Sequence, residues 1–397
     1  MKRRLFLGLA LASALATPAR AEAKFEAFIQ SLWPQVKAAG FSRALFDAAF
    51  KGITEADPVV IKLADNQPEF KSTTSEYLDK TVTPARIAQG KAKLDEDGAL
   101  LSAISAKYGV DKRALLGIWG IESNYGHEMG SMSVMRSLAT LIYYGNKKQY
   151  AREQLIAAFT ILKRGIRSPD NFTGSWAGAL GHTQFIPTTY LASAADWDGD
   201  GKKDIWGSKA DALASTAHYL SQSGWKADRP WGWEVKLPDG FDRGLIGRAH
   251  WKTVAEWERA GVKPAIGDQF SAPAAKAFVM IPQGIDGPVF LITQNFLALL
   301  AYNYSHGYAL AVAMLGDRIA GGPKVQTAWP AQNVDLTFKE RVEMQDRLTN
   351  AGFDTSGADG RFGAKTYEAV LAYQKKMGMA LDGFPSRKVL ERLRGAK

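Results

Sequence analysis

The stretch GIWGIESNYG, residues 117–126, places a single carboxylate, Glu122, directly after an aromatic and apolar run. Asp111 is suited to cap the start of a helix that runs through Ile118 and Trp119. Glu122 follows Ile118 by four residues and Trp119 by three, so it lies on the apolar face of that helix. Desolvation on such a face raises the pKa of a carboxyl group, which suits a general acid near neutral pH. The alternative is an ordinary glutamate that reaches solvent from the end of a helix.

A second stretch, SWAGALGHTQFIPTTY at residues 175–190, combines small residues with uncharged polar ones. Its alanines and glycines allow a close approach of the backbone, and its hydrogen-bonding groups come from Ser175, Thr183 and Gln184. Groups of this kind suit a neutral ligand that is rich in hydroxyl and amide groups. The stretch is equally consistent with a tight packing turn.

The N-terminus predicts export. Three basic residues at positions 2–4 precede a short apolar segment, and Ala19-Arg20-Ala21 offers a cleavage site, so residues 1–21 are typical of a signal peptide. The apolar segment is too short for a comfortable membrane span. The chain contains no cysteine, which rules out disulfides and a lipid anchor on cysteine and favours a bacterial periplasm.

Composition narrows the possible partners. The 397 residues are 46% apolar, enough for a substantial core, and they include 11 Trp and 13 Tyr, rings that often line carbohydrate grooves. The formal net charge is +10, or about +6 without the four basic residues of the signal peptide. Export argues against a nucleic acid partner, whereas a basic exported protein suits an anionic envelope polymer. A basic surface that serves only solubility is the alternative.

The pattern of apolar residues divides the chain. Spacings of three and four predict helices over most of residues 25–165, and residues 226–290 read as short strands, among them AFVMIP and PVFLIT. Helical patterning returns from residue 293 and is followed by GGPKVQTAWPAQNVD, which has no periodicity and predicts a linker. The last sixty residues predict three short helices in a compact domain.

The stretches at residues 117–126 and 175–190, together with a third at 299–312, resemble the signatures of a known family. GIWGIESNYG, SWAGALGHTQFIPTTY and LLAYNYSHGYALAV (299–312) occur in the order seen in soluble lytic murein transglycosylases related to the membrane-bound lytic transglycosylase B proteins. The resemblance extends over residues 25–322. It implies a mainly α (α+β) fold, with a lysozyme-like helical catalytic core and a small sheet-containing insertion.

The resemblance also implies roles for individual residues. Glu122 would be the catalytic acid and base, and a further set would bind substrate along the glycan groove: Ser123, Ser175, Gln184, Tyr302, Asn303 and Tyr308. In the implied reaction, Glu122 protonates the glycosidic oxygen between N-acetylmuramic acid and N-acetylglucosamine. It then takes a proton from the muramic C6 hydroxyl, which closes onto C1, so no second carboxylate is required. A hydrolysing muramidase with a distant second acid and a non-catalytic wall-binding protein are the alternatives.

An Asp-rich loop, DWDGDGKKDIW at residues 196–206, follows the spacing of a calcium-binding EF-hand. Gly207 stands where that pattern has a closing glutamate, so a later residue would have to close the site. The predicted ligands of a structural Ca²⁺ are Asp196, Asp198, Asp200, Asp204 and Asp211. A turn that only binds water and caps a helix is the alternative. No cofactor is required for the implied catalysis.

The C-terminal segment GADGRFGAKTYEAVLAYQKKMGMALDG, residues 357–383, resembles a small three-helix peptidoglycan-binding domain. Ala369, Val370 and Tyr373 are spaced as core residues of a helix. Such a domain would tether the enzyme to its polymer and raise its local concentration there. A domain that only packs or docks a partner is the alternative.

The predicted organisation is therefore a signal peptide at 1–21, a catalytic domain at 22–322, a linker at 323–335 and a peptidoglycan-binding domain at 336–397. The predicted partner is the glycan strand of peptidoglycan, without a membrane span. His127-Glu128 does not extend to a zinc-binding H-E-x-x-H motif, and no phosphate-binding loop or dinucleotide fingerprint is present. The five histidines are scattered singly, which favours ordinary core or surface roles.

Overall fold

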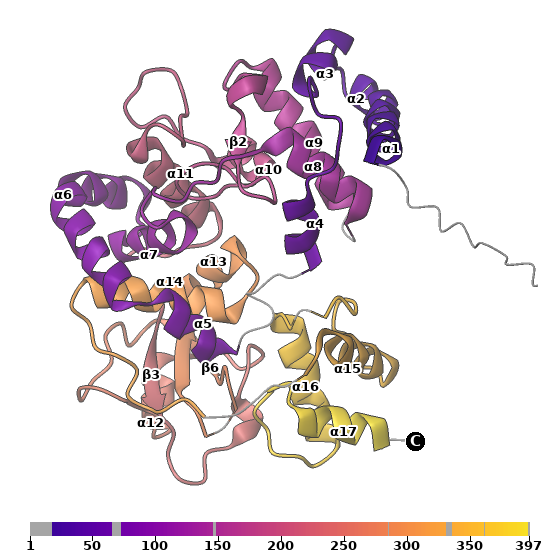
Figure 1. Cartoon of the computed structure of the whole chain (residues 1–397). Coiled ribbons are helices and arrows are strands. Elements are labelled where there is room, and N and C mark those ends of the chain that lie inside the picture. The colour runs from indigo at the N-terminus through magenta and orange to yellow at the C-terminus, as the bar shows by residue number, and fades with distance from the viewer. Residues whose placement is uncertain are drawn as a thin grey trace, which may run out of the picture. The chain divides into compact units, whose positions relative to one another are not determined.

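The computed structural model describes residues 18–65, 73–145, 148–284, 286–330, 336–360 and 362–395. The chain divides into two compact units (Figure 1). Unit 1 comprises residues 1–65 and 131–178, and unit 2 comprises residues 66–130 and 179–397. Residues 1–17 of the predicted signal peptide lie outside the described residues, and residues 18–21 form the first turn of helix α1. The predicted linker is described only as far as residue 330.

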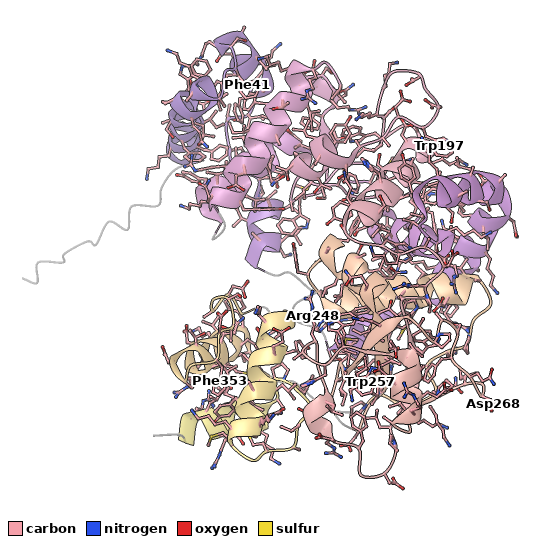
Figure 2. The ribbon with its side chains drawn as sticks, turned by 180° about the vertical axis from the view of Figure 1, so that it is seen from behind. Phe41, Trp197, Arg248, Trp257, Asp268 and Phe353 are labelled. Atoms are coloured by element: carbon pink, nitrogen blue, oxygen red, sulfur yellow. The ribbon has the colours of Figure 1, made fainter. Side chains whose placement is uncertain are left out.

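Unit 1 is helical, with one two-stranded antiparallel ribbon that pairs Met132 with Gly174. The rings of Phe46 and Phe159 stack in its core at 6.0 Å, and Phe41, labelled in Figure 2, lies beside Phe159. Its elements are α1 (Pro18–Ser31), α2 (Trp33–Ala38), α3 (Arg43–Ala49), α4 (Pro58–Asp65), β1 (Met132–Ser133), α8 (Val134–Tyr144), α9 (Lys148–Lys163), a 3₁₀ turn (Pro169–Asn171) and β2 (Thr173–Gly174).

The helical part of unit 2 holds the first signature. Asp111 caps α7, because its side chain accepts a hydrogen bond from the backbone N–H of Arg113, as the sequence predicts. Helix α6 ends at Tyr108 and is capped by Gly109, whose φ of +67° is natural for glycine. The helices of this part are α5 (Thr74–Thr81), α6 (Pro84–Tyr108), α7 (Lys112–Ser123), α10 (Pro187–Ser193), α11 (Lys209–Gln222), α13 (Gln294–Tyr302) and α14 (His306–Ile319).

Helices α7 and α14 pack side by side at unusually close range (Figure 1). A methyl group at Gly117 would collide with the carbonyl oxygen of Val312, and one at Gly120 would lie 2.8 Å from the side chain of Leu315. Gly316 on α14 faces the backbone of α7 in the same way. The two glycines of GIWG therefore let the first and third signatures meet, although they are almost 200 residues apart in the chain.

The sheet predicted from residues 226–290 is present in unit 2. Its five antiparallel strands follow the order β4-β6-β7-β3-β5, and Phe278 pairs with Ile292. Trp257, labelled in Figure 2, is fully buried against the sheet and donates its indole N–H to the carbonyl oxygen of Ala277 at 2.9 Å. The elements are β3 (Gly232–Lys236), a 3₁₀ turn (Arg243–Leu245), β4 (Lys252–Thr253), α12 (Val254–Arg259), β5 (Lys263–Pro264), β6 (Lys276–Met280) and β7 (Val289–Thr293).

Three C-terminal helices follow, as the sequence predicts: α15 (Phe338–Asn350), α16 (Ala364–Lys376) and α17 (Arg387–Gly395). Ala369, Val370 and Tyr373 are buried in their shared core, which confirms the prediction that they serve packing. Thr337 and Glu340 form a reciprocal capping box at the start of α15. The fold is mainly α with small sheets, in agreement with the predicted class. Among the described residues, every helix is too short or too polar to cross a membrane.

Candidate active site

Glu122 lies in the last turn of α7, where the chain leaves the helix. Asn124 and Tyr125 adopt left-handed backbone conformations, with φ of 49° and 58°, which turn the chain sharply after Ser123. The side chain of Glu122 is half-buried. Its Oε1 accepts a hydrogen bond of 2.5 Å from the hydroxyl of Tyr308 on α14. The sequence thus predicts the position of Glu122 on its helix, and the structure adds a hydrogen-bond donor from the third signature.

Two stacked tyrosines support this carboxylate. The rings of Tyr302 and Tyr308 lie 6.3 Å apart and almost parallel, at 13°. Tyr302 donates its hydroxyl to the carbonyl oxygen of Thr183 at 2.6 Å. Burial, followed by the nearby charge of Glu122, raises the pKa of both tyrosines well above the usual 10. Both hydroxyls therefore remain neutral hydrogen-bond donors at neutral pH.

The second signature folds into a tight loop whose backbone bridges Leu180 to Phe185. Gln184 has a left-handed φ of 51°, and its side-chain amide donates to the carbonyl oxygens of Met129 at 3.0 Å and Gly181 at 2.8 Å. The amide nitrogen of Gln184 therefore fixes the loop. A contact of Gln184 with substrate stays a prediction.

Ser123 directly follows Glu122 in the chain, and Asn303 directly follows Tyr302. The Ser123 hydroxyl is buried, donates to the carbonyl oxygen of His182 at 2.5 Å and accepts from the N–H of Gly126 at 2.9 Å. These bonds hold the turn after Glu122, which fits an orienting role better than direct contact with a ligand. Asn303 is the C-cap residue of α13, in extended backbone conformation.

Five of the six predicted substrate residues thus come from the ends of α7, α13 and α14 and from the 180–185 loop, all within unit 2. Ser175 belongs to unit 1, where its carbonyl oxygen accepts from the N–H of Gly178 and its hydroxyl from the N–H of Ala177. Its place in a glycan groove with Glu122 stays a prediction.

One residue of the site has no assigned role in the sequence prediction. Nδ1 of His182 accepts a hydrogen bond of 3.2 Å from the indole N–H of Trp119. Trp119 lies on α7, one helical turn before Glu122. Burial lowers the pKa of the His182 imidazole, in keeping with a neutral ring. A single scattered histidine carries no motif. The indirect signal was Gly126, where a side chain would collide with this ring.

The Asp-rich loop brings three of its five predicted ligands together. Carboxylate oxygens of Asp196, Asp198 and Asp211 lie within 4.8 Å of one another. Asp200 and Asp204 are not part of this group, and their carboxylates accept hydrogen bonds from the backbone N–H groups of Lys202 and Trp206. Burial raises the pKa of Asp211. Three carboxylates that offer only hard oxygen atoms fit a cation such as Ca²⁺.

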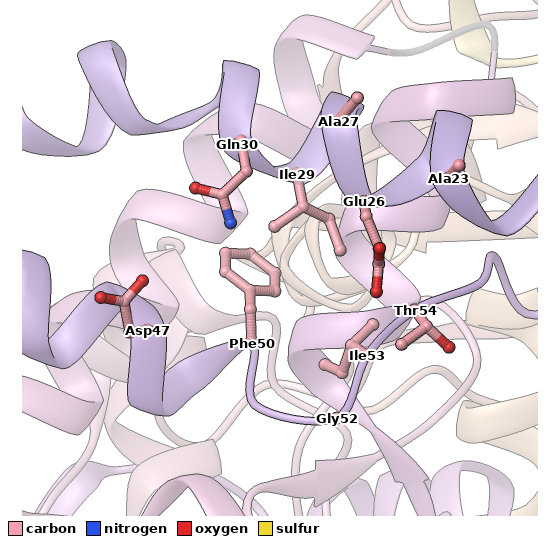
Figure 3. A pocket seen from close by; sticks show the side chains of 10 residues that line it. All are labelled: Ala23, Glu26, Ala27, Ile29, Gln30, Asp47, Phe50, Gly52, Ile53 and Thr54. Atoms are coloured by element: carbon pink, nitrogen blue, oxygen red, sulfur yellow. The ribbon is translucent and has the colours of Figure 1, made fainter.

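A separate cleft of about 440 Å³ lies in unit 1, between α1 and the segment that follows α3 (Figure 3). Its lining includes Glu26 from α1 and Asp47 from α3. Asp47 is paired with Arg43 at 2.8 Å. None of the residues predicted to act in catalysis or binding lines this cleft.

The arrangement around Glu122 supports proton transfer. A half-buried carboxyl group can release a proton to a bound oxygen, and the Tyr308 hydroxyl then stabilises the carboxylate that remains. The same carboxylate can afterwards accept a proton from another group of the ligand. One acid with a fixed neutral donor is sufficient for both steps.

Comparison with known proteins follows the same division of the chain. Residues 24–317 match the family described as the transglycosylase SLT domain, and residues 339–393 match the peptidoglycan binding domain family. The curated membrane-bound lytic murein transglycosylase B of Escherichia coli (strain K12) is 28% identical over 298 residues, which cover 71% of this chain and 79% of the relative.

Two solved structures are also similar. SltB3 from Pseudomonas aeruginosa, in complex with NAG-anhNAM-pentapeptide, is 44% identical with a TM-score of 0.83, covering 93% of this chain and 99% of that one. The lytic transglycosylase Slt35 of Escherichia coli, in complex with calcium, is 26% identical with a TM-score of 0.59, covering 75% of this chain and 92% of that one.

Proposed function

This chain belongs to the family of transglycosylase SLT domains, and we propose that Glu122 is the acid and base with which it cleaves peptidoglycan. The chain is a peptidoglycan lytic transglycosylase, and its C-terminal segment is a peptidoglycan-binding domain. The observation that carries the assignment of Glu122 is the 2.5 Å hydrogen bond from Tyr308, which joins the first signature to the third.

The reaction cleaves the β-1,4 bond between N-acetylmuramic acid and N-acetylglucosamine. Glu122 gives its proton to the glycosidic oxygen as the C1–O bond breaks, and C1 develops oxocarbenium character. The C6 hydroxyl of the muramic residue then bonds to C1 and passes its proton to Glu122. The enzyme regains its starting protonation state, and no water is consumed. The anhNAM unit bound to the relative SltB3 supports a 1,6-anhydro product for this chain.

The mass of the products tests this proposal. Digestion of purified peptidoglycan should release muropeptides that end in anhydromuramic acid, each lighter by one water than the corresponding reducing end. Mass spectrometry distinguishes the two. Reducing ends would instead identify a hydrolysing muramidase. No released product from a folded chain that binds the wall would identify a non-catalytic wall protein.

The proposed location of the enzyme is the periplasm. The support is the segment at residues 1–21, with its basic start, short apolar run and cleavage site. The substrate is itself a polymer of the cell envelope. The absence of cysteine from the chain agrees with a protein that carries neither disulfides nor a lipid anchor on cysteine.

A structural Ca²⁺ at Asp196, Asp198 and Asp211 is the second part of the proposal. The support is the convergence of their carboxylate oxygens within 4.8 Å and the calcium present in the Slt35 relative. Asp211 is 1% exposed and accepts from the backbone N–H groups of Trp197 and Asp204, so it would fix the loop against α11. A cation there would offset the mutual repulsion of three carboxylates.

Calcium should therefore raise the thermal stability of the protein. At 100 times its Kd a bound ion stabilises the folded state by about 2.7 kcal/mol, which corresponds to a rise in Tm of roughly 5 °C for a unit of this size. Asp198→Asn should abolish most of this rise in calorimetry. Asp200→Asn is the matched control, because Asp200 lies outside the cluster, and it should keep the rise. An equal Tm with calcium and with a chelator would contradict the site.

A further inference from the structure

His182 sits in a loop that leaves its backbone little freedom. The N–H of His182 donates to the carbonyl oxygen of Ile205 at 2.9 Å. The preceding residue, Gly181, has a φ of +66°, and a side chain there would collide with the same carbonyl group. The loop is also closed by the bridge between Leu180 and Phe185. The direction in which the imidazole leaves the backbone is therefore fixed by the fold.

The imidazole ring is held against α7. Trp119 is 1% exposed and donates its indole N–H to Nδ1 of His182 at 3.2 Å, with the two rings 5.8 Å apart. Because an indole nitrogen can only donate, Nδ1 must be unprotonated and the ring proton sits on Nε2. Gly126 leaves the space that the ring occupies, since a methyl group there would collide with it.

Burial, more than the surrounding charges, favours the neutral form of the ring. Burial is the main cause that lowers the pKa of His182. Asp204 opposes this effect, whereas Lys209 and Lys93 add to it. Lys93 also lies over the ring of Trp119 at 5.9 Å. The acceptor that Trp119 needs is therefore present at neutral pH.

His182 contacts α7 on both sides of Glu122. Trp119 precedes Glu122 by three residues, one turn of the helix, and it bonds to the imidazole. Ser123 follows Glu122 directly and donates its hydroxyl to the carbonyl oxygen of His182 at 2.5 Å. The next carbonyl group of the loop, that of Thr183, accepts the hydroxyl of Tyr302. The loop thus fixes the turn of α7 that carries Glu122. It also fixes Tyr302, whose ring stacks on Tyr308, the hydrogen-bond donor to Glu122.

We propose that His182 is a positioning residue for catalysis. Its neutral Nδ1 accepts the Trp119 N–H and so fixes the last turn of α7, which holds the carboxyl group of Glu122 in its productive direction. His182 acts through Trp119 and needs no contact with substrate. The proposal rests on the proposed role of Glu122. On this proposal His182 affects the rate of the chemical step and not the binding of the glycan.

The test compares two replacements of His182. Asn offers an amide oxygen close to the position of Nδ1, whereas Phe fills the space without an acceptor and leaves the Trp119 N–H unpaired. With soluble glycan strands, His182→Phe should lower kcat roughly 10-fold and change KM by less than about 2-fold, and His182→Asn should remain within about 3-fold of the unaltered enzyme. An Asn variant as slow as the Phe variant would overturn the proposal.

A double-mutant cycle with Trp119→Phe makes the test specific. This replacement removes the indole N–H, so the acceptor at residue 182 no longer matters, and His182→Phe should then change kcat by less than about 2-fold. An undiminished loss of about 10-fold in that background would also overturn the proposal. Tm values recorded for every variant separate a loss of folded protein from a loss of rate. The anhydro product of the unaltered enzyme tests the proposed function separately, because these rate ratios do not depend on product type.

Discussion

Replacing Glu122 with Gln is expected to lower kcat for peptidoglycan cleavage by at least about 10³-fold. General acid–base catalysis by one group contributes about 10²–10⁴, and in the proposed reaction the same carboxyl group serves both proton transfers. Glutamine has the same shape, and its amide oxygen can still accept the hydroxyl of Tyr308. The variant should therefore fold with an unchanged Tm. Release of muropeptides from purified wall, followed by chromatography, measures the loss.

Glu128→Gln is the matched control for this variant. Glu128 is an exposed carboxylate six residues later, beyond the end of α7, and it accepts a hydrogen bond from the side-chain amide of Asn124 at 3.3 Å. The same replacement of a carboxyl group by an amide is made in the same segment without changing Glu122, so kcat should stay within about 2-fold. If Glu122→Gln behaved like this control, Glu122 could not be the proton donor.

Binding to the insoluble wall should survive in Glu122→Gln. The C-terminal helices have their own core, formed by residues such as Met344, Val370 and Leu390, and Glu122 has no part in it. A chain that ends before residue 323 should instead lose most of its retention on wall sediment while it still cleaves short soluble glycans. Retention that depended on Glu122 would mean that the tether is not in the C-terminal domain.

The fold was largely accessible from the sequence because its signals are local. Periodic apolar spacing marks the helices, and Asp111 is a capping residue directly before α7. The strands at 276–280 and 289–293 are short, mostly apolar runs. Each of these signals lies within a few residues of the element it predicts.

The site was less accessible because its contacts are long-range. The partners Tyr308 and Glu122 are 186 residues apart, and Trp119 and His182 are 63 apart. No periodicity encodes such pairs, and the family resemblance identified Tyr308 only as part of the groove. The glycines of GIWG were the physical clue, because helices approach this closely only where side chains are missing.

The Asp-rich loop shows a different limit. Its spacing suggested five ligands, but in the structure three of them, Asp196, Asp198 and Asp211, bring carboxylate oxygens within 4.8 Å of one another. Asp211 joins Asp196 and Asp198 because α11 carries it back toward the loop. A linear pattern records which oxygen-bearing residues are available. The turn geometry decides which of them face one another.

Tyr308→Phe is expected to lower kcat roughly 10- to 150-fold with little change in KM. A hydrogen bond to a charged group is worth about 1.5–3 kcal/mol, and each 1.36 kcal/mol in the barrier is tenfold in rate. The Tyr308 hydroxyl becomes most important when Glu122 has given up its proton, because the bond to a carboxylate is then charge-assisted. Its loss therefore weakens the transition state more than substrate binding. Steady-state kinetics on soluble glycan strands measures both constants.

Tyr219→Phe provides the control that isolates this bond. Tyr219 is a half-buried ring beside Tyr302, at 5.2 Å, and its hydroxyl donates to the backbone carbonyl of Ala301 at 2.7 Å rather than to Glu122. Both replacements remove one hydroxyl from the same aromatic cluster, so their costs in Tm should be similar. Only Tyr308→Phe should lower kcat by more than about 3-fold. Equal kinetic effects would mean that the cluster as a whole, and not the bond between Tyr308 and Glu122, supports the carboxylate through the reaction.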